Sequence, residues 1–332
     1  MRSPAETRRP QEIPTGWRIV FFGTPEFAVA SLRALVEAGE NVVGVVTQPD
    51  KPAGRGRRTT APPVKQYSLQ LGLPVIQPQK IRNNPEFVAL LRRWAPDVIV
   101  VVAYGKILPP DILALPPHGC INVHASLLPR YRGAAPIQWA LIRGETRTGI
   151  SVMLMTEEMD AGPVLLQCPL TIEPEETYGE LEKRLAELGA TCLLRALRGW
   201  RAATIQAQPQ DTTQVTFAPP ITKDMGQIDW SRPAEEVARW IRGLSPNPGA
   251  YFTWEGKRVK VYRARAHEKT ASPSLGPAGT VVSVEPTLMV ACGRGVLELV
   301  EVQLEGRRRA SGSEVARGLR WRPGQELAET ST

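Results

Sequence analysis

Short apolar runs alternate with segments of helical spacing from residue 17 to about residue 205. The runs are long enough for strands, and they carry few polar residues, which is typical of strands buried on both faces. We expect strands at 17–23, 41–47, 73–76, 97–103, 119–124, 148–155 and 163–171, and helices at 25–39, 64–71, 85–94 and 178–198, with a Pro-, Gly- and Arg-rich loop at 48–63. Strands and helices in alternation predict a doubly wound, mostly parallel α/β sheet over residues 17–205.

The pattern changes after residue 205. Residues 206–220 are rich in Gln, Thr and Pro, show no clear period and are interpreted as a linker. From 221 to 332, short strands at 257–263, 279–284, 287–291 and 296–302 with Gly-containing turns predict a small β-barrel domain. Residues 1–16 are polar and Pro-rich, lack the apolar core of a secretory signal, and are expected to be a disordered extension.

Composition and charge narrow the class of protein without deciding it. The 332 residues carry a net charge of +8, which is compatible with a polyanionic partner. No apolar run is long enough for a membrane span. The four cysteines are scattered, form no Cys-x-x-Cys pair and are joined by only three histidines, which disfavours zinc and favours buried thiols in a cytoplasmic protein. We expect a monomer by default.

Asn122 and His124 are the first candidates for chemistry. They stand two residues apart at the end of a predicted strand, so their side chains point to the same side. An Asn amide can stabilise an oxyanion, and a His can relay a proton, a pairing that suits attack on a carbonyl. A purely structural Asn–His pair is the alternative. The turn that follows, Ser126 to Gly133, has little reason to exist as packing and favours a ligand site.

A third group is needed to orient the histidine. Asp160 lies in a loop after the predicted strand 148–155, and loops that follow neighbouring parallel strands meet at one sheet edge. Asp160 is therefore placed to face His124, although spacing alone makes Glu157 and Glu158 equal candidates.

These motifs together resemble the folate-dependent formyltransferase family. The signature is Asn122-x-His124-x-Ser126-Leu-Leu-Pro-x-x-x-Gly133 followed by Asp160-x-Gly162. Phe22-Gly-Thr-Pro-Glu-Phe, residues 47–58 and Val101-Val-Ala-Tyr-Gly resemble the branch of the family that acts on methionyl-tRNA. The match runs through nearly the whole chain. A minor departure is Ala61-Pro-Pro-Val-Lys, where the branch often has a Ser before Pro-Val-Lys.

The resemblance implies a Rossmann-like catalytic domain, an OB-like tRNA-binding domain, and transfer of formyl from 10-formyltetrahydrofolate to the α-amino group of initiator methionyl-tRNA for translation initiation. It implies that Asn122 and His124 stabilise the oxyanion, that Asp160 holds His124, and that no metal takes part. Folate contacts are expected from Val102, Tyr104, Gly105, Ser126, Leu127, Leu128 and Pro129. For tRNA we expect contacts from Arg55, Arg57, Arg58, Lys257, Arg258, Lys260 and Arg263.

Three alternatives stay open. Another folate-dependent N-formyltransferase, acting on an amino sugar or a purine precursor, would share the Asn-His-Asp centre but need neither the Arg-rich loop nor a basic C-terminal barrel. A nucleotide-cofactor oxidoreductase is disfavoured because Gly23-Thr-Pro-Glu-Phe stands where G-x-G-x-x-G is expected. A non-catalytic RNA-binding module would leave the Asn-His-Asp group without a task.

Overall fold

A computed structural model describes residues 16–53, 58–267 and 276–327. Of the expected N-terminal extension, residues 1–15 lie outside this range, as do Arg55 and Arg57; for Arg58 the backbone is described but the side chain is not. Contacts divide the chain into two compact units, residues 1–123 and 124–332, which are taken in turn.

Parallel strands form the centre of the first unit. They are β1 (Arg18–Gly23), β2 (Asn41–Val46), β5 (Val75–Ile76), β6 (Val98–Val102) and β7 (Cys120–His124), in the order β5-β2-β1-β6-β7. All residues of β6 are buried. Because successive side chains point to opposite faces, both faces of the sheet must be covered at this strand.

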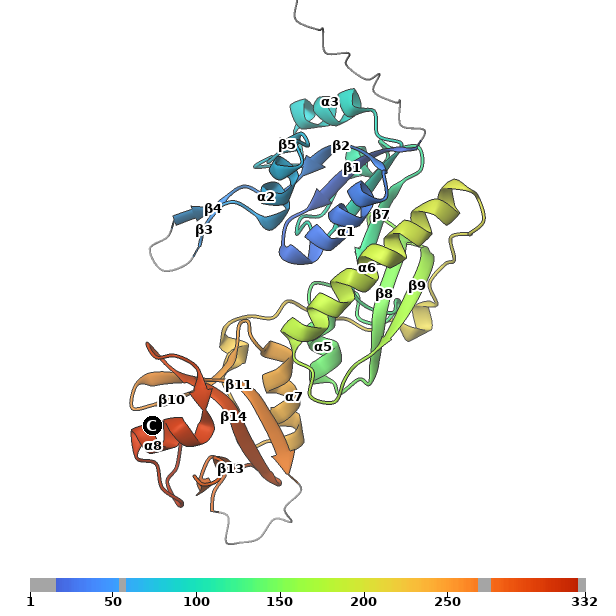
Figure 1. Ribbon diagram of the computed structural model, residues 1–332. Helices are drawn as coiled ribbons and strands as arrows, with labels where there is room; N and C mark the ends of the chain where they lie inside the picture. Colours follow the sequence, from blue (N-terminus) through green and yellow to red (C-terminus); the bar gives the residue numbers. More distant parts are fainter. Residues whose placement is uncertain (1–15, 54–57, 268–275, 328–332) are drawn as a thin grey trace, which may run out of the picture. The chain divides into compact units, whose positions relative to one another are not determined.

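Helices supply that cover. They are α1 (Glu26–Glu37), α2 (Pro63–Gln70), α3 (Pro85–Trp94) and the short α4 (Pro110–Leu113). Helix α1 lies against β1, β2 and β6 (Figure 1). Trp94 packs so closely on β2 that a side chain at Gly44 would collide with its ring at 2.6 Å. The predicted strands and helices of this unit are confirmed; α4 was not predicted.

The expected loop between residues 48 and 63 contains a short ribbon. Its strands β3 (Lys51–Ala53) and β4 (Arg58–Thr60) pair antiparallel, with Lys51 opposite Thr60. The loop prediction was wrong at these residues. Two three-residue strands with Pro, Arg and Thr carry no apolar alternation, so hydrophobic patterning does not reveal them.

The second unit begins with a helix and an antiparallel strand pair. These are α5 (Pro136–Ile142), β8 (Arg147–Leu154) and β9 (Val164–Thr171), followed by the long helix α6 (Tyr178–Arg201), which packs on both strands. Helix α6 starts at a capping box: the Thr177 backbone N–H donates to Glu180 Oε2 at 3.0 Å. Short 3₁₀ turns follow at Thr212–Gln214 and Asp224–Gly226.

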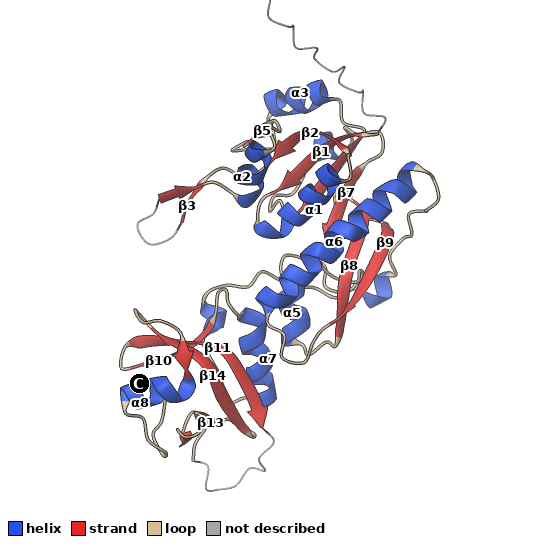
Figure 2. Ribbon diagram, viewed as in Figure 1, coloured by secondary structure: helices blue, strands red, loops and turns tan. Residues whose placement is uncertain are grey.

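An antiparallel sheet closes the second unit (Figure 2). Its strands are β10 (Ala250–Trp254), β11 (Lys257–His267), β12 (Val281–Ser283), β13 (Met289–Ala291), β14 (Val296–Leu304) and β15 (Ala310–Ser311), in the order β10-β11-β14-β13-β12 with β15 on β14. Helices α7 (Ala234–Leu244) and α8 (Gly312–Leu319) accompany it. Phe252, Val261, Leu299 and Trp321 are among its core residues.

The fold class is thus confirmed: a mostly parallel α/β sheet and a C-terminal antiparallel sheet domain. The four predicted C-terminal strands are present. Helices α5, α7 and α8 were not predicted. Each is short and lies in a region read as strands, turns or loop, where a few apolar residues at helical spacing are outweighed by the surrounding pattern.

Candidate active site

Strand β7 presents Asn122 and His124 on one side, as alternation requires. Asn122 is half-buried, and the His124 side chain is nearly enclosed. Nε2 of His124 lies 2.9 Å from the carbonyl oxygen of Tyr131. Nδ1 lies 3.6 Å from Oδ1 of Asp160. The histidine is therefore held between the turn that follows its own strand and the loop that follows β8.

These neighbours fix the protons on the imidazole ring. A carbonyl oxygen only accepts hydrogen bonds, so Nε2 must carry a proton. Nδ1 faces a carboxylate, which is also an acceptor when ionised. Both nitrogens thus face acceptors. At 3.6 Å the contact between Nδ1 and Oδ1 of Asp160 is longer than a hydrogen bond, and it is an ion pair only when the ring is protonated.

The backbone of Asp160 has a positive φ angle. Its φ is 53°, the left-handed region that non-glycine residues seldom adopt. Its Oδ2 accepts a 2.8 Å hydrogen bond from the Gly133 backbone N–H, so the carboxylate bridges Gly133 and His124. Of the competing acids, Glu158 is exposed and lies 3.3 Å from Nη1 of Arg132. Asp160, rather than Glu158, is the acid that faces His124.

Gln210 braces the Asp160 loop from the segment expected to be a linker. Its Nε2 donates to the carbonyl oxygens of Asp160 at 2.8 Å and Gly162 at 2.7 Å. Its Oε1 accepts from Nη2 of Arg132 at 2.8 Å and from Nε at 3.1 Å. Arg132 is itself buried. The glutamine thus ties the loop after β8 to the turn after β7, and no motif in the sequence pointed to it.

The same segment makes Gly133 necessary. Arg132 N–H donates to the Thr216 carbonyl at 2.9 Å, and the Ala218 N–H donates to the Arg132 carbonyl at 2.8 Å. Gly133 has a φ of +122°, and a Cβ there would lie 2.6 Å from the Ala218 carbonyl oxygen. Only glycine permits this close approach, which leaves the Gly133 N–H aimed at Asp160.

The predicted folate segment Ser126–Pro129 is pinned by two polar side chains from β8 and β9. Ser151 Oγ donates to the Ser126 carbonyl at 2.7 Å and accepts from the Leu128 N–H at 3.0 Å. Gln167 Nε2 donates to the Leu128 carbonyl at 2.8 Å. The segment therefore has a fixed path. Ser151 and Gln167 were not predicted, because isolated polar residues in apolar strands carry no motif.

The other predicted folate segment, Val102 to Gly105, follows β6 in the first unit. The Tyr104 carbonyl accepts from Thr24 Oγ1 at 3.0 Å and from Gln48 Nε2 at 2.8 Å. The Tyr104 ring is buried, and its hydroxyl has no hydrogen-bond partner among the described residues. Burial raises the pKa of that hydroxyl to about 12, so it stays a protonated donor.

Residues 17–197 match the family described as Formyl transferase, and residues 220–320 match its C-terminal domain. The chain belongs to the formyl transferase family. A methionyl-tRNA formyltransferase of Myxococcus xanthus is 49% identical over 310 residues, which cover 93% of this chain and 97% of the relative. One of Caldanaerobacter subterraneus is 48% identical, covering 88% of this chain and 94% of the relative.

Solved structures share the fold at low identity. HypX from Aquifex aeolicus, in complex with tetrahydrofolic acid, has a TM-score of 0.61 at 18% identity; the match covers 91% of this chain and 47% of HypX. The sugar 3N-formyl transferase WlaRD has a TM-score of 0.64 at 13% identity, covering 88% of this chain and 99% of WlaRD. These structural neighbours establish the architecture, whereas the family follows from the sequence matches.

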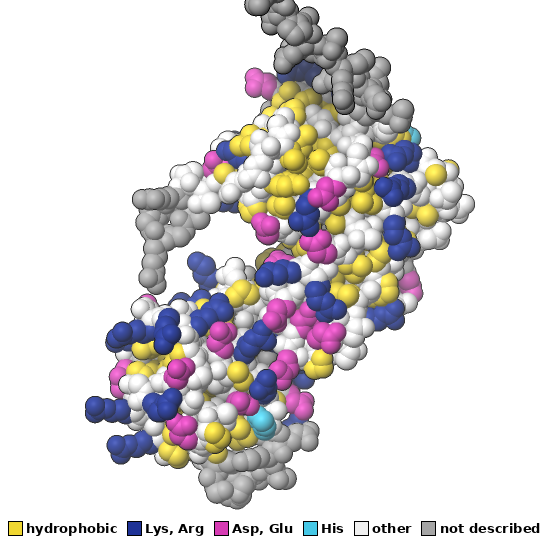
Figure 3. Space-filling model, viewed as in Figure 1, with side chains coloured by type: hydrophobic (Ala, Val, Ile, Leu, Met, Phe, Trp, Pro, Cys, Tyr) yellow, Lys and Arg dark blue, Asp and Glu magenta, His cyan; other side chains and the backbone are white. Residues whose placement is uncertain are grey.

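The formyltransferase C-terminal domain carries basic side chains on β11 and near it. Arg258 is exposed and stacks on the Tyr251 ring, with its guanidinium carbon 4.4 Å from the ring centroid. Arg309 stacks on Tyr262 at 3.5 Å. Lys260 donates to the Pro248 carbonyl at 2.8 Å. Lys257 is exposed. Figure 3 shows Lys and Arg side chains gathered over this domain on the face in view.

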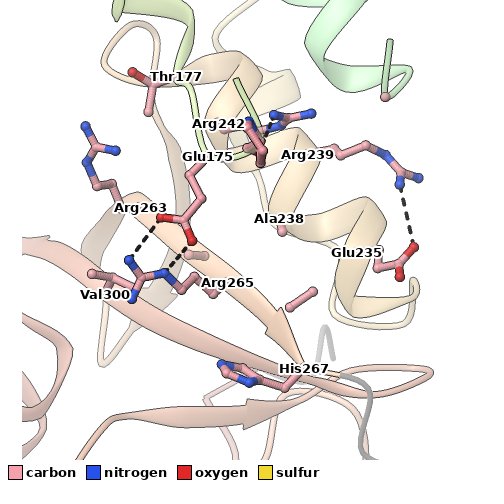
Figure 4. Close-up of a pocket in the computed structure, with 14 residues that line it drawn as sticks. Glu175, Thr177, Glu235, Ala238, Arg239, Arg242, Arg263, Arg265, His267 and Val300 are labelled. Carbon is pink, nitrogen blue, oxygen red and sulfur yellow. Dashed lines mark hydrogen bonds and ion pairs between the residues drawn. The ribbon is translucent and has the colours of Figure 1, made fainter. Parts of the chain in front are cut away.

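Arg263 differs from its neighbours on β11. It forms an ion pair with Glu180, near the start of α6. Two residues on, Arg265 holds Glu175 through hydrogen bonds of 2.6 and 3.0 Å. Both arginines line a cavity of 410 Å³ between β11 and α7 (Figure 4). The strand thus has exposed basic residues at its start, whereas its later arginines pair with acids on α6 and on the segment just before α6.

Two further findings concern the described residues only. They contain no group of three or more His, Cys, Asp or Glu side chains placed to hold a metal ion, and no helix long and apolar enough to cross a membrane. All four cysteines are free and buried. Burial raises the pKa of the Cys120 and Cys292 thiols to about 12, which keeps them protonated and unreactive.

Proposed function

We propose that this protein transfers the formyl group of 10-formyltetrahydrofolate to the α-amino group of initiator methionyl-tRNA, as a monomer in the cytoplasm. The observation that carries the proposal is the His124–Asp160 pair, held at the end of β7 in a chain 49% identical to a methionyl-tRNA formyltransferase. The named relatives match over nearly their full lengths, so both domains of the chain are included.

The residues suit attack of an amine on a formyl carbon. The acceptor amine must be neutral to use its lone pair, and a free α-amino group has a pKa of about 7.7–8.0, which esterification of the carboxyl lowers. Little base strength is therefore needed. As the amine adds, negative charge develops on the formyl oxygen. The Asn122 amide is one donor to this oxygen. His124 is the other through Nδ1–H, because its Nε2–H is already bonded to the Tyr131 carbonyl and its Nδ1 is too far from Asp160 for a hydrogen bond.

Asp160 takes the positioning and proton-transfer role. Its carboxylate is fixed by the Gly133 N–H and stabilises positive charge on the His124 ring. A proton removed from the attacking amine can reach the departing folate nitrogen through this pair. Bond formation to the amine nitrogen and cleavage of the folate N–formyl bond then balance, with no covalent enzyme intermediate.

The folate contacts are assigned to Val102, Tyr104 and Gly105 and to residues 126–129. The buried Tyr104 hydroxyl fits a polar ligand group, because it is a donor without a partner among the described residues. Ser126 to Pro129 follow a fixed path, since Ser151 and Gln167 hold both of its flanks. A carbonyl has two lone pairs, so those already bonded can still accept from a pterin.

Contacts with tRNA are assigned to Arg55, Arg57 and Arg58 and to the basic part of β11. On β11, Arg258 and Lys257 are exposed, which makes them the best candidates for contacts with tRNA. Arg263 is less suited than its neighbours because Glu180 already neutralises it.

A transfer assay with labelled 10-formyltetrahydrofolate tests the function. Charged initiator tRNA is offered in one reaction, and free methionine or amino sugars in others. We expect label on the charged tRNA alone. Label on an amino sugar would move the protein to the sugar branch of the family. Absence of label from every acceptor would refute formyl transfer itself.

A further inference from the structure

Phe217 is an exposed aromatic residue whose two chain neighbours, Thr216 and Ala218, are half-buried and buried. Its side chain is 65% exposed, the highest value for a large apolar side chain in the described part of the chain. The next residue, Ala218, is fully buried. Single exposed apolar residues are common and need no explanation on their own. What distinguishes Phe217 is how its backbone is held and what surrounds it.

The backbone around Phe217 is rigidly bonded. Phe217 pairs with Arg132 in a parallel bridge, and hydrogen bonds join Arg132 to the residues on either side of Phe217. The Phe217 carbonyl accepts from Arg143 Nη2 at 3.1 Å, and the Pro219 carbonyl accepts from Trp139 Nε1 at 2.8 Å. A mobile loop would let the ring fold back onto the surface. This backbone keeps it displayed, and a pre-organised ring loses little entropy on binding.

Cationic and aromatic side chains lie beside this segment. The Arg143 guanidinium that donates to Phe217 sits 5.1 Å from the Tyr131 ring centroid and 5.4 Å from that of Trp139. Arg130, which is half-exposed, lies 5.6 Å from the Tyr131 centroid and pairs with Glu145. An exposed ring next to arginines stacked on aromatic side chains is the composition of single-stranded nucleic acid sites.

The same backbone reaches the catalytic histidine. Tyr131, whose carbonyl accepts from His124, donates its own N–H to Thr216 Oγ1 at 2.9 Å. Phe217 thus follows directly after Thr216, the residue whose hydroxyl is hydrogen-bonded to the turn that holds His124.

We propose that Phe217 is a stacking site for a nucleobase of the unpaired 3′ end of the acceptor tRNA, with the exposed Arg143 beside it facing its phosphates. The inference rests on the proposed function. In an aminoacyl-tRNA the amino acid that carries the reactive amine is esterified through its carboxyl group to the terminal ribose, so the last bases must lie close to the formyl-transfer centre. Unpaired bases expose faces that aromatic side chains and arginines recognise without sequence preference.

Binding to two forms of initiator tRNA tests the proposal, one intact and one lacking its unpaired 3′ nucleotides. Phe217→Ala should weaken binding of the intact tRNA at least about fivefold, the loss of one base stack, and leave the truncated tRNA unaffected. Phe217→Trp should bind the intact tRNA as the wild type does. Leu69→Ala is the matched control, because Leu69 is similarly exposed, at 58%, on α2.

The outcomes separate this inference from the proposed function. Wild-type protein that fails to formylate charged tRNA would refute the function. Wild-type transfer with equal losses of both tRNA forms in Phe217→Ala would overturn the stacking site while leaving the function in place. Wild-type binding by Phe217→Leu would also overturn it, because a leucine side chain keeps the apolar contact but has no ring to stack on a base.

Discussion

At the scale of single residues, the proposed chemistry depends on how His124 is held. Its Nε2 proton is fixed by the Tyr131 carbonyl, so the ring has one orientation, and its Nδ1 lies 3.6 Å from Asp160, which leaves an Nδ1–H free to donate to a substrate. Such a donor stabilises charge that exists only in the transition state, and its removal costs rate rather than substrate binding.

We therefore expect His124→Ala to lower kcat by about 100- to 1000-fold and to change tRNA affinity by less than about twofold. Single-turnover transfer and a filter-binding isotherm measure the two quantities. His118→Ala is the control, because His118 stacks on Trp17 in the first unit, 4.2 Å between centroids. Loss of tRNA binding in parallel with activity would show that His124 is structural instead.

Gln210 offers a sharper test of positioning. If it acts by holding the Asp160 loop, Gln210→Ala should lower kcat by about 10- to 100-fold through misplacement of Asp160, with little change in KM for either substrate. In an Asp160→Ala background the same substitution should cost almost nothing more, since coupled residues are non-additive. Gln208→Ala, an exposed neighbour, should behave as wild type. Additive losses would mean that Gln210 does not work through Asp160.

Sequence patterns reach some of these residues and not others. Asn122 and His124 follow from strand alternation, and Asp160 follows from its place after a strand, although spacing did not separate it from Glu158. Gln210, Ser151 and Gln167 were not found. Each works by bonding to main-chain groups distant in sequence, as Gln210 does to Asp160 and Gly162, and such contacts exist only after the chain has folded.

At the scale of elements, the segment 206–220 does more than connect. It pairs with the turn after β7, braces the loop after β8 through Gln210 and displays Phe217. Its low hydrophobicity and lack of period are typical of linkers, and that pattern cannot reveal pairing through backbone groups. The long apolar strands and helix α6 were predicted well because burial imposes a period on them. The β3–β4 ribbon carries no such period, whereas α7, which buries Val237, Ile241 and Leu244 at helical spacing, carries one that was missed.

The close approach of this segment at Gly133 makes a stability prediction. Gly133→Ala places a Cβ 2.6 Å from the Ala218 carbonyl oxygen at a φ that alanine avoids. We expect the free energy of unfolding to fall by at least about 1–3 kcal/mol, measured by denaturant titration. Gly318→Ala is the matched control, because a Cβ at this exposed position of α8 meets nothing within 4 Å; it should be neutral or stabilise by about 0.5–1 kcal/mol. Equal effects would contradict the close approach.

At the scale of the whole molecule, the net charge of +8 says less than the way individual charges are paired. On β11 alone, Arg263 and Arg265 are neutralised by Glu180 and Glu175, whereas Arg258 is stacked on Tyr251 and exposed. A sequence shows the number of basic residues along a strand. It does not show the bulge between Val261 and Ala264, which shifts the register within the strand.

Two substitutions that remove the same charge from the same strand separate these roles. Arg258→Gln should weaken tRNA binding and reduce the slope of log affinity against log salt by about one, because a phosphate contact and its released counterion are lost. Arg263→Gln should leave that slope unchanged, since its guanidinium is committed to Glu180. KM for the formyl donor should stay constant in both. If both variants reduced the slope equally, Arg263 would contact tRNA as Arg258 does. Its ion pair with Glu180 would then form only in the free enzyme.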